Sequence, residues 1–372
     1  MRKIGLITFC NHELKVNYGQ VLQAYALYKY LSMQGHQVKV INYRVPYEDE
    51  SGLCFKLFGK TYWYQEHYKK IKEKKMYSER NRKFYHFVRK KINITKPCYT
   101  EADVTRELED CDVFMAGSDQ IWNIKAYDVV RLLGVNKNIQ RISYASSGLF
   151  EENNEAEIVY EQMKKYWSNI DNISVREESG KRIIEKYTGK KVLHVVDPVL
   201  LLDKKQWLME NKKEKETYIL CYFLGSIRMY SHILEYIKNK VGAKKIIFVE
   251  AENTKKDLEL GELRRNVGPE EFVRLIYDAE FVCTDSYHGT LFSIIFEKQF
   301  CLFKRKEKAK NSFSSEERWK ILFEEWGLSE RWIRNIKEYE NLVDINYYEL
   351  PNVIKTYIEH SKKYLDSALG EK

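Results

Sequence analysis

The chain has 372 residues, of which 44% are hydrophobic and 31% are charged. At about 150 residues per domain, this length predicts two domains or one large one, and the composition supports a sizeable core and excludes a disordered chain. No stretch approaches the roughly 18 uncharged apolar residues of a membrane span, and the apolar run after Lys3 is too short for a signal peptide. We therefore expect neither secretion nor membrane spanning.

Seven cysteines are spread along the chain without a C-x-x-C pair. This pattern argues against a disulfide framework or a zinc knuckle and is typical of free thiols in a reducing cytoplasm. Most of the cysteines lie in or beside apolar runs, where we interpret them as small buried hydrophobic residues rather than nucleophiles. We expect a cytoplasmic protein.

Apolar runs that alternate with helical patterns predict an α/β fold. Lys3–Phe9 predicts a strand, the following apolar residues at helical spacing predict a helix, and Gln37–Tyr43 predicts a second strand. Such a βαβ unit pairs its strands in parallel and needs cover on both faces. The other strands predicted in this series are 112–116, 141–145, 172–175 and 193–196. A second series follows, with strands predicted at 218–223, 245–249, 281–284 and 300–303.

Two consecutive α/β series predict two Rossmann-like domains facing a cleft. The polar stretch 203–216 separates them, so we expect an N-terminal domain over 1–203 and a C-terminal domain over 204–372 that ends in a helix. A basic segment at about 55–95 interrupts the first series and predicts a helical insertion.

Positive charge is concentrated between Gln65 and Lys91, which hold eight Lys, three Arg and three Glu interleaved with apolar and aromatic residues. Such a stretch is typical of a surface for nucleic acid, an anionic membrane face or a phosphorylated lipid carrier, and also of a solvated helix with a buried stripe. No helix-turn-helix, zinc-finger or RNP-type pattern accompanies it, so we expect no nucleic-acid partner.

Ligands of doubly wound sheets bind at the carboxyl ends of the strands, which directs attention to the loops there. The loop after the first strand contains Asn17-Tyr18-Gly19-Gln20 and opens a helix. Gly19 would permit close backbone approach and the helix N-terminus would offer N–H groups to an anion or an acceptor. An N-cap by Asn17 without any ligand explains the same residues.

The loop after strand 112–116 begins Gly117-Ser118-Asp119-Gln120 and continues with Trp122-Asn123. Polar groups packed at a strand end would be costly if buried without partners, so we predict a binding loop, with a hydrogen-bonded elbow as the alternative. Asp110 and Asp112 form a D-x-D at the opposite end of this strand, and we interpret them as turn or strand-start residues.

Arg176 follows strand 172–175, where a guanidinium is well suited to bind a carboxylate or phosphate. The alternative is a salt bridge to Glu177, Glu178 or Asp197. Arg318, after a polar loop, is a second candidate for anion binding or a solvated arginine.

His288 lies between strand 281–284 and a following helix, next to Gly289. Histidine ordinarily titrates near neutral pH, so His288 is the best-placed general acid or base of the chain. No cluster of His, Cys, Asp and Glu with metal-ligand spacing follows a predicted strand, so we expect no metal and no cofactor.

Several of these segments together resemble the polysaccharide pyruvyl transferase family. They lie in the family's order over residues 3 to about 332, and the resemblance implies the two-domain fold called GT-B. The matching stretches are KIGLITF, NYGQVLQAYALYKYL, GHQVKVINYR, FMAGSDQIWN, RISYASSG, SVREESG, VVDPVLLL, TDSYHGTLFSIIFEKQF and, more weakly, NSFSSEERWKILFEEWGL.

The resemblance implies transfer of a carboxyethylidene (pyruvyl) group from phosphoenolpyruvate to sugar hydroxyls of a cell-surface polysaccharide precursor, forming a pyruvate ketal. His288, on the family's HG histidine, would protonate the methylene carbon of the enol. Arg176, in the family's SVR position, would hold the donor's anionic groups, with Arg318 as a second cation. A lipid-linked acceptor would place the segment 65–91 at the inner membrane face, as a peripheral contact.

The sequence departs from the family directly before His288. Better-studied members carry Arg-Leu or a similar pair there, whereas this chain has Ser286-Tyr287, which leaves the identity of the donor open. Ser286, Gly289 and Thr290 at the helix N-terminus would then hold a phosphate without a full charge. Two alternatives remain: a GT-B nucleotide-sugar glycosyltransferase, and a non-catalytic glycan- or carrier-binding component of a polysaccharide assembly.

Overall fold

The computed structural model describes residues 1–10, 16–44, 79–125, 127–148, 150–208, 214, 216–226, 230–251, 260–304, 319 and 321–370. The chain divides into two compact units, Met1–Pro198 with Tyr364–Lys372, and Val199–Lys363. The boundary expected after residue 203 lies a few residues beyond this division. The last residues of the expected C-terminal helix belong to the first unit, not to the second.

The first unit is built on parallel strands, as the βαβ pattern predicts. Four of them form a sheet in the order β2-β1-β3-β4. β5 and β6 form a further parallel pair, which isolated bridges connect to β4 and to the loop after it. The strands are β1 (Lys3–Ile7), β2 (Gln37–Val40), β3 (Val113–Ala116), β4 (Gln140–Ser143), β5 (Ile173–Val175) and β6 (Val192–His194).

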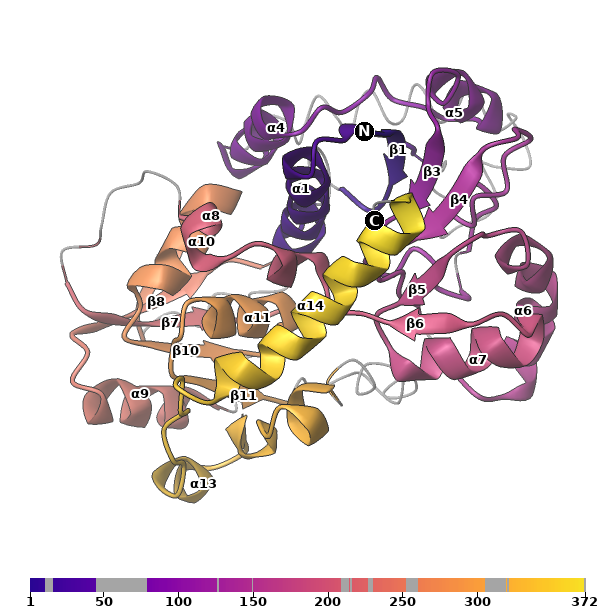
Figure 1. Ribbon diagram of the computed structural model, residues 1–372. Coiled ribbons are helices and arrows are strands. Elements are labelled where there is room, and N and C mark those ends of the chain that lie inside the picture. Colours follow the sequence, from indigo (N-terminus) through magenta and orange to yellow (C-terminus); the bar gives the residue numbers. More distant parts are fainter. Residues whose placement is uncertain are drawn as a thin grey trace, which may run out of the picture. The chain divides into compact units, whose positions relative to one another are not determined.

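Helices cover both faces of this unit, because its central strands β1 and β3 are apolar on both sides. On one face α1 packs with α4, through Tyr18 against Phe84 and Tyr25 against Phe87. On the other face α5, α6 and α7 enclose a core that includes Trp122 and Trp167 (Figure 1). The helices are α1 (Tyr18–Met33), α4 (Glu79–Lys91), α5 (Glu101–Glu107), α6 (Asn154–Trp167) and α7 (Glu178–Thr188).

The second unit repeats this architecture with six parallel strands in the order β12-β11-β10-β7-β8-β9. The strands predicted by the second series are all present, whereas β9 and β12 were not predicted because they are too short to show a pattern. The strands are β7 (Tyr218–Tyr222), β8 (Lys245–Val249), β9 (Glu262–Arg264), β10 (Phe281–Thr284), β11 (Phe300–Phe303) and β12 (Trp332–Ile333).

Two aromatic-rich layers enclose this second sheet. One contains residues of α9 and α13, and the other joins α8, α10 and α11 through Trp207, Phe272 and Phe292 (Figure 1). The helices are η1 (Pro198–Leu201), α8 (Lys204–Trp207), α9 (Ser231–Lys240), α10 (Pro269–Asp278), α11 (Tyr287–Ile295), η3 (Ile321–Glu325), η4 (Ser329–Arg331), α13 (Ile336–Glu340) and α14 (Leu350–Leu369).

The described residues bear on two predictions from the sequence, free cysteines and no membrane-spanning helix. The cysteines at 10, 98, 111, 221, 283 and 301 are all free thiols. Among the helices that the structure describes, none combines the length and apolar character that crossing a membrane requires.

The end of α14 is part of the core of the first unit. Tyr364 is 6% exposed, and its hydroxyl donates a hydrogen bond of 2.7 Å to the carbonyl oxygen of Ser143 at the end of β4. Leu365 and Leu369 are buried as well. These residues therefore complete a unit whose other residues precede the whole second unit in the chain.

We expect Tyr364→Phe to lower the free energy of unfolding by about 1 kcal/mol, because it removes one buried hydrogen bond. Tyr364→Ala should lower it by about 3–5 kcal/mol, because it also leaves a cavity. Urea denaturation followed by circular dichroism measures both. His360→Ala, at an exposed position of the same helix, is the control and should change little. Equal urea midpoints for Tyr364→Ala and the wild type would show that this packing does not stabilise the unit.

Candidate active site

The turn between β10 and α11 is held by its own hydroxyl groups. Ser286 caps α11, accepting at Oγ from the Gly289 N–H at 3.3 Å. The Thr284 hydroxyl donates to the Tyr222 carbonyl oxygen at 2.6 Å and accepts from the Ser286 N–H at 3.0 Å. A Cβ added to Gly289 would lie 2.8 Å from the Thr284 Oγ1, so a glycine is needed for this close approach. These contacts therefore fix the turn both at the end of β10 and at the start of α11.

His288 is the second residue of α11 and is partly exposed. Its ring lies edge-on to Tyr287, with 5.6 Å between the centroids, and Tyr287 in turn packs against Trp319 at 5.5 Å. Because β10 pairs in parallel with both neighbours, this histidine stands at the carboxyl edge of the second sheet, as predicted. The side chain is partly exposed but its Nε2 atom is buried, so proton exchange with a bound molecule would use Nδ1 or require the ring to turn.

Two of the phosphate contacts predicted for this turn do not fit the geometry. The Gly289 N–H is already bonded to the Ser286 Oγ, and the Thr290 hydroxyl donates to the Ser286 carbonyl oxygen at 3.1 Å. Ser286 itself uses its hydroxyl oxygen as an acceptor, which leaves its proton as a donor. Of the three groups, Ser286 is therefore the one whose proton has no acceptor among the described residues.

Asp285 fixes the neighbouring loop after β7. Its carboxylate accepts from the N–H groups of Leu224 at 2.7 Å and Gly225 at 2.8 Å. Backbone N–H groups at such a strand end are those that bind the phosphates of nucleotides in many α/β proteins. Here a carboxylate occupies both of them.

In the first unit, Arg176 lies in a buried ion-pair cluster at the end of β5. Its Nη1 contacts the Asp197 Oδ2 at 2.8 Å, its Nε contacts the Glu177 Oε1 at 3.3 Å, and its Nη2 donates to the Ser147 Oγ at 2.8 Å. Ser147 donates in turn to Glu177. Arg176 is 3% exposed, and the Asp197 side chain is fully buried. This is the salt bridge considered as the alternative from the sequence. A guanidinium engaged at Nε, Nη1 and Nη2 does not fit the predicted role of a donor-binding cation.

The loop after β3 is a hydrogen-bonded elbow, the alternative considered for it. The Ser118 carbonyl oxygen accepts from the Thr8 hydroxyl at 2.7 Å, and the Gly117 carbonyl oxygen accepts from the Ser146 hydroxyl at 3.0 Å. Asp119 adopts a left-handed φ of 70°, and its carbonyl oxygen accepts from the N–H of Ser147 at 3.0 Å. These bonds join the carboxyl ends of β1, β3 and β4.

Gln23 is a residue of this edge that sequence analysis missed. It is fully buried in α1, and its Nε2, which has two hydrogens, lies 2.9 Å from each of three acceptors: the Thr8 Oγ1, the Phe9 carbonyl oxygen and the Gln20 carbonyl oxygen. A polar residue four positions before Leu27, on the apolar face of the predicted helix, was the available signal. Among the described residues, the Gln23 Oε1 and the Ser118 Oγ have no hydrogen-bond partner.

Several predicted loop residues have structural roles instead of lying open to a ligand. Asn17 caps α1 by accepting from the Gln20 N–H at 3.2 Å, Tyr18 is buried against Phe84, and the Asn123 side chain accepts from the Lys125 N–H. Trp122 is fully buried, and its Nε1 donates to the Arg131 carbonyl oxygen at 3.0 Å. The predicted binding role of Trp122 therefore does not fit its position. The residues Gly19, Gly117, Gln120 and Asp119 remain near the strand ends, where Gln120 and Asp119 are partly exposed.

Asp110, Asp112 and Arg318 are the other residues considered from the sequence. The Asp112 carboxylate accepts from the Lys3 N–H at 2.8 Å and Asp110 pairs with Lys39 at 2.6 Å, so both secure strand starts, as interpreted from the sequence. The contact with Lys39 holds the pKa of Asp110 below its usual value. Arg318 lies outside the described residues. Within the described part of the chain, no three His, Cys, Asp or Glu side chains are grouped as metal ligands would be.

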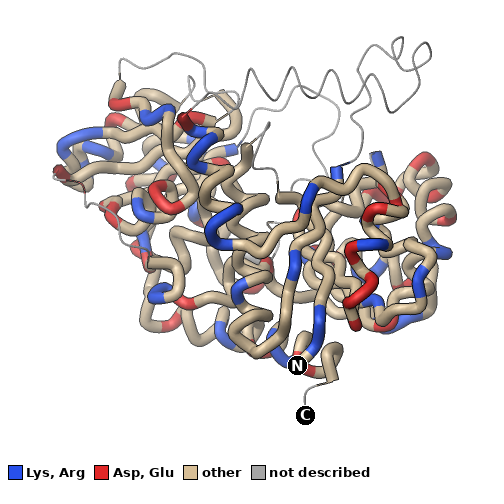
Figure 2. Tube along the Cα trace, turned by 90° about the horizontal axis from the view of Figure 1, so that it is seen from above, with Lys and Arg blue, Asp and Glu red and all other residues tan. Residues whose placement is uncertain are grey.

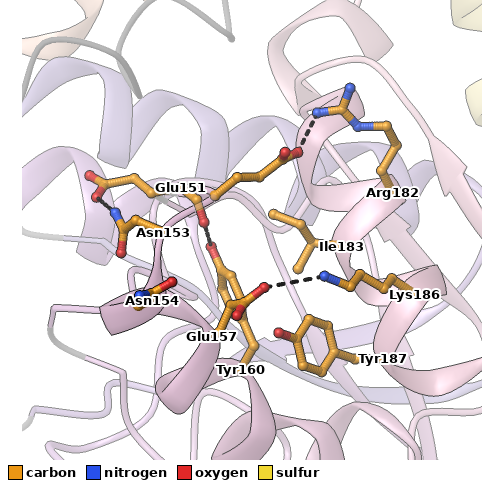
Figure 3. A pocket seen from close by; sticks show the side chains of 10 residues that line it. Glu151, Asn153, Asn154, Glu157, Tyr160, Arg182, Ile183, Lys186 and Tyr187 are labelled. Atoms are coloured by element: carbon orange, nitrogen blue, oxygen red, sulfur yellow. Dashed lines mark hydrogen bonds and ion pairs between the residues drawn. The ribbon is translucent and has the colours of Figure 1, made fainter.

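An exposed groove of about 450 Å³ lies between α6 and α7, away from every residue singled out in the sequence. Charged side chains pair across it: Lys186 meets Glu157 at 3.3 Å, as Figure 3 shows. Arg182 meets Glu152 at 2.8 Å. Tyr160 and Tyr187 form its aromatic part, with 5.6 Å between their centroids. Both of its cations are thus paired with carboxylates of the same groove.

Solved structures with a similar fold support the architecture. A protein from Listeria monocytogenes described as a UDP-N-acetylglucosamine 2-epimerase superposes with a TM-score of 0.50 at 10% identity, covering 98% of this chain and 90% of that one. Another UDP-N-acetylglucosamine 2-epimerase gives 0.51 at 10% identity, covering 99% and 95%. At such identities the likeness shows the fold alone, and it confirms the predicted GT-B-like α/β class.

Comparison with known sequences says more about the family of the chain than comparison of folds does. No curated protein matches the chain. The family described as polysaccharide pyruvyl transferase matches residues 17–307, a span that includes the loop after β3, the Arg176 cluster and the turn carrying His288. Since this match covers well over half of the chain, the protein belongs to the polysaccharide pyruvyl transferase family and is a transferase.

Proposed function

We propose that the protein transfers a pyruvyl group from phosphoenolpyruvate to two hydroxyls of a sugar in a cell-surface polysaccharide precursor, forming a pyruvate ketal. Membership of the family supports the class of reaction. The observation that carries the proposal is the position of His288, partly exposed on a hydrogen-bonded turn at the carboxyl edge of its sheet.

In the proposed reaction His288 is the general acid. Its imidazolium donates a proton to the methylene carbon of the enol, which becomes a methyl group and leaves the neighbouring carbon electrophilic. One sugar hydroxyl adds to that carbon, and a second displaces the phosphate to close the ketal. Of the two hydroxyl protons released, one replaces the proton given by His288 and the other leaves with phosphate. Ser286 supports the donor phosphate, together with the positive end of α11.

The geometry favours this reaction over transfer from a nucleotide sugar. In that alternative the backbone after β7 would have to bind a diphosphate, but Asp285 occupies the N–H groups of Leu224 and Gly225. A carboxylate at this position would also repel a diphosphate. Incubation with phosphoenolpyruvate and a panel of sugars tests the proposal, because only pyruvyl transfer releases phosphate that depends on the acceptor. A nucleotide-sugar enzyme or a non-catalytic binding component would release none.

We expect His288→Gln to lower acceptor-dependent phosphate release about 10²–10⁴-fold, since it removes the proton donor but keeps a polar side chain of similar size. A coupled phosphate assay measures the rate, and circular dichroism verifies the fold. His232→Gln, at an exposed position on α9, is the matched control and should keep full activity. A His288→Gln variant with more than about a tenth of the wild-type rate would show that another group is the acid.

The Arg176 cluster generates a prediction about stability rather than donor affinity. Arg176→Gln should lower the free energy of unfolding by about 3–5 kcal/mol, because it leaves the buried Asp197 carboxylate without its cation. The control is Arg182→Gln, whose ion pair with Glu152 is exposed, so that the loss should stay below about 1 kcal/mol. A variant with unchanged stability and a raised KM for phosphoenolpyruvate would instead identify Arg176 as a donor-binding residue.

We also propose that the acceptor is lipid-linked and that basic residues draw the enzyme to an anionic membrane face. Residues 65–78 lie outside the described residues, but α4 supplies the end of the basic segment. Its aromatic residues Phe84 and Phe87 are buried, so they cannot insert into lipid. Its outer face keeps Arg82, Arg89 and Lys90 exposed. Figure 2 shows basic and acidic residues intermixed elsewhere along the described chain.

Wild-type protein should co-sediment with anionic liposomes at low ionic strength, and salt should release it. Each Lys or Arg near such a surface contributes about 1 kcal/mol, and the attraction fades beyond a Debye length. Changing Arg82, Arg89 and Lys90 to Gln should therefore weaken binding without lowering the rate on a soluble sugar. The matched control removes the same charge from the same unit by changing Lys164, Lys165 and Arg182 to Gln. The membrane proposal is ruled out if both triple variants bind the liposomes equally well, or if the wild type does not co-sediment with them.

A further inference from the structure

Arg131 lies in an apolar stretch of the loop between β3 and β4. Its neighbours Val130 and Leu132 are 3% and 0% exposed, and they draw this part of the loop into the core. The guanidinium carbon stands 4.3 Å from the ring centroid of Phe9 and 5.8 Å from that of Tyr43. Phe9 follows β1 and Tyr43 follows β2, so the cation lies beside the carboxyl edge of the first sheet.

The stacked guanidinium is held in place but its N–H groups are not used within the protein. In the part of the chain that the structure describes, no hydrogen bond or ion pair joins them to an acceptor. The nearby Asp128 carboxylate has other partners: it accepts from the backbone N–H groups of Val130 and Arg131 and from the Tyr43 hydroxyl. Stacking covers a face of a guanidinium, whereas its hydrogen bonds leave in the plane from its edges. The edges of Arg131 therefore remain available.

Two other arginines of the same unit differ in this respect. Arg176 contacts two carboxylates and a hydroxyl, and Arg141 donates to the carbonyl oxygens of Leu133, Val135, Lys137 and Ile139. Arg131 is partly exposed; its partial burial lowers the pKa of the guanidinium, and the nearby Asp128 carboxylate opposes that shift. A guanidinium that is held by two aromatic rings and has no hydrogen-bonded acceptor among the described residues can offer its N–H edges to an anion.

We propose that Arg131 anchors an anion-binding subsite at the carboxyl edge of the first unit, which takes a phosphate or carboxylate group of a substrate. The inference rests on the proposed function, whose donor and acceptor both offer such groups: phosphoenolpyruvate carries a carboxylate and a phosphate, and a lipid-linked sugar carries phosphate. A planar fork of N–H donors matches either group in two-pronged geometry. In sequence, the signal was a single charged residue within Val129-Val130-Arg131-Leu132-Leu133.

Binding of inorganic phosphate tests the subsite directly, without any reaction. We expect phosphate and phosphoenolpyruvate to raise the melting temperature of the wild type. Arg131→Met keeps an apolar side chain on Phe9 and leaves the bond between Trp122 and the residue 131 carbonyl oxygen intact, but it should weaken phosphate binding about ten- to hundredfold. Arg131→Lys keeps the charge but not the planar pair of N–H donors, so it should lose less phosphate affinity than Arg131→Met. This variant also tests the subsite if Arg131→Met fails to fold. Arg182→Met, at an exposed arginine, is the matched control and should bind as the wild type does.

Kinetic measurements then identify the source of the anion. A KM raised about tenfold or more by Arg131→Met for phosphoenolpyruvate alone assigns the subsite to the donor. A KM raised for a sugar 1-phosphate, but not for the matching neutral sugar, assigns it to the acceptor. If the wild type transfers no pyruvyl group, the proposed function fails. The subsite can still be tested, because the thermal shift measures binding of phosphoenolpyruvate and of sugar 1-phosphate without any reaction.

Three results would overturn the inference. The first is the absence of any thermal shift of the wild type by phosphate, phosphoenolpyruvate or sugar 1-phosphate. The second is an equal shift in Arg131→Met and in Arg182→Met. The third is loss of phosphate binding in Arg131→Met with every substrate bound as tightly as before, which would mean an adventitious ion only.

Discussion

Parallel pairing of the strands is the constraint on which the rest of this structure depends. Every pairing between the described strands is parallel, so within each unit all strands end at one edge of the sheet. The connections have to return over the faces, which is why helices cover both sides and why the central strands, such as β3, β7 and β10, are fully buried. What remains polar is concentrated in the loops at the carboxyl edges. The residues proposed to act on a substrate therefore lie in a few turns, among them the turn that carries His288.

At these edges the polar groups bond mainly with one another, and this decides which of them can act on a substrate. Arg176, Asp197, Glu177 and Ser147 form a closed cluster, and Asp285 occupies two backbone N–H groups. Such groups hold loops in position, and their removal leaves buried charge without a counterpart. His288 and Arg131 differ, because each is fixed by packing on an aromatic ring. Stacking covers the faces of the Arg131 guanidinium and leaves its edges for the proposed anion, whereas the ring of His288 lies edge-on to its neighbour.

The sequence predicted most strands and the carboxyl-edge position of His288, because apolar runs of four or five residues and a histidine after such a run are local signals. It did not predict β9 or β12, whose two or three residues form no pattern. It could not decide the state of Arg176, because its partner Asp197 is distant in the chain and only the pairing of β5 with β6 brings them together. Trp122 was misjudged because a hydrogen-bonding indole in a polar loop can equally face the core, where its Nε1 finds the Arg131 carbonyl oxygen. Gln23 and Arg131 each stand as one polar residue among apolar ones, a signal that is easily passed over.

Burial of the end of α14 in the first unit has a consequence for the order of events during synthesis. Tyr364, Leu365 and Leu369 leave the ribosome after the whole second unit has been made, yet they belong to the core built around β4. Domains commonly fold as they emerge, N-terminal part first. Here the first unit would wait in an incomplete state, with the carbonyl of Ser143 and the ring of Tyr144 uncovered, until translation has passed the second. Such a nascent chain has a long interval in which apolar surface is exposed, and chaperones would have their opportunity to bind in that interval.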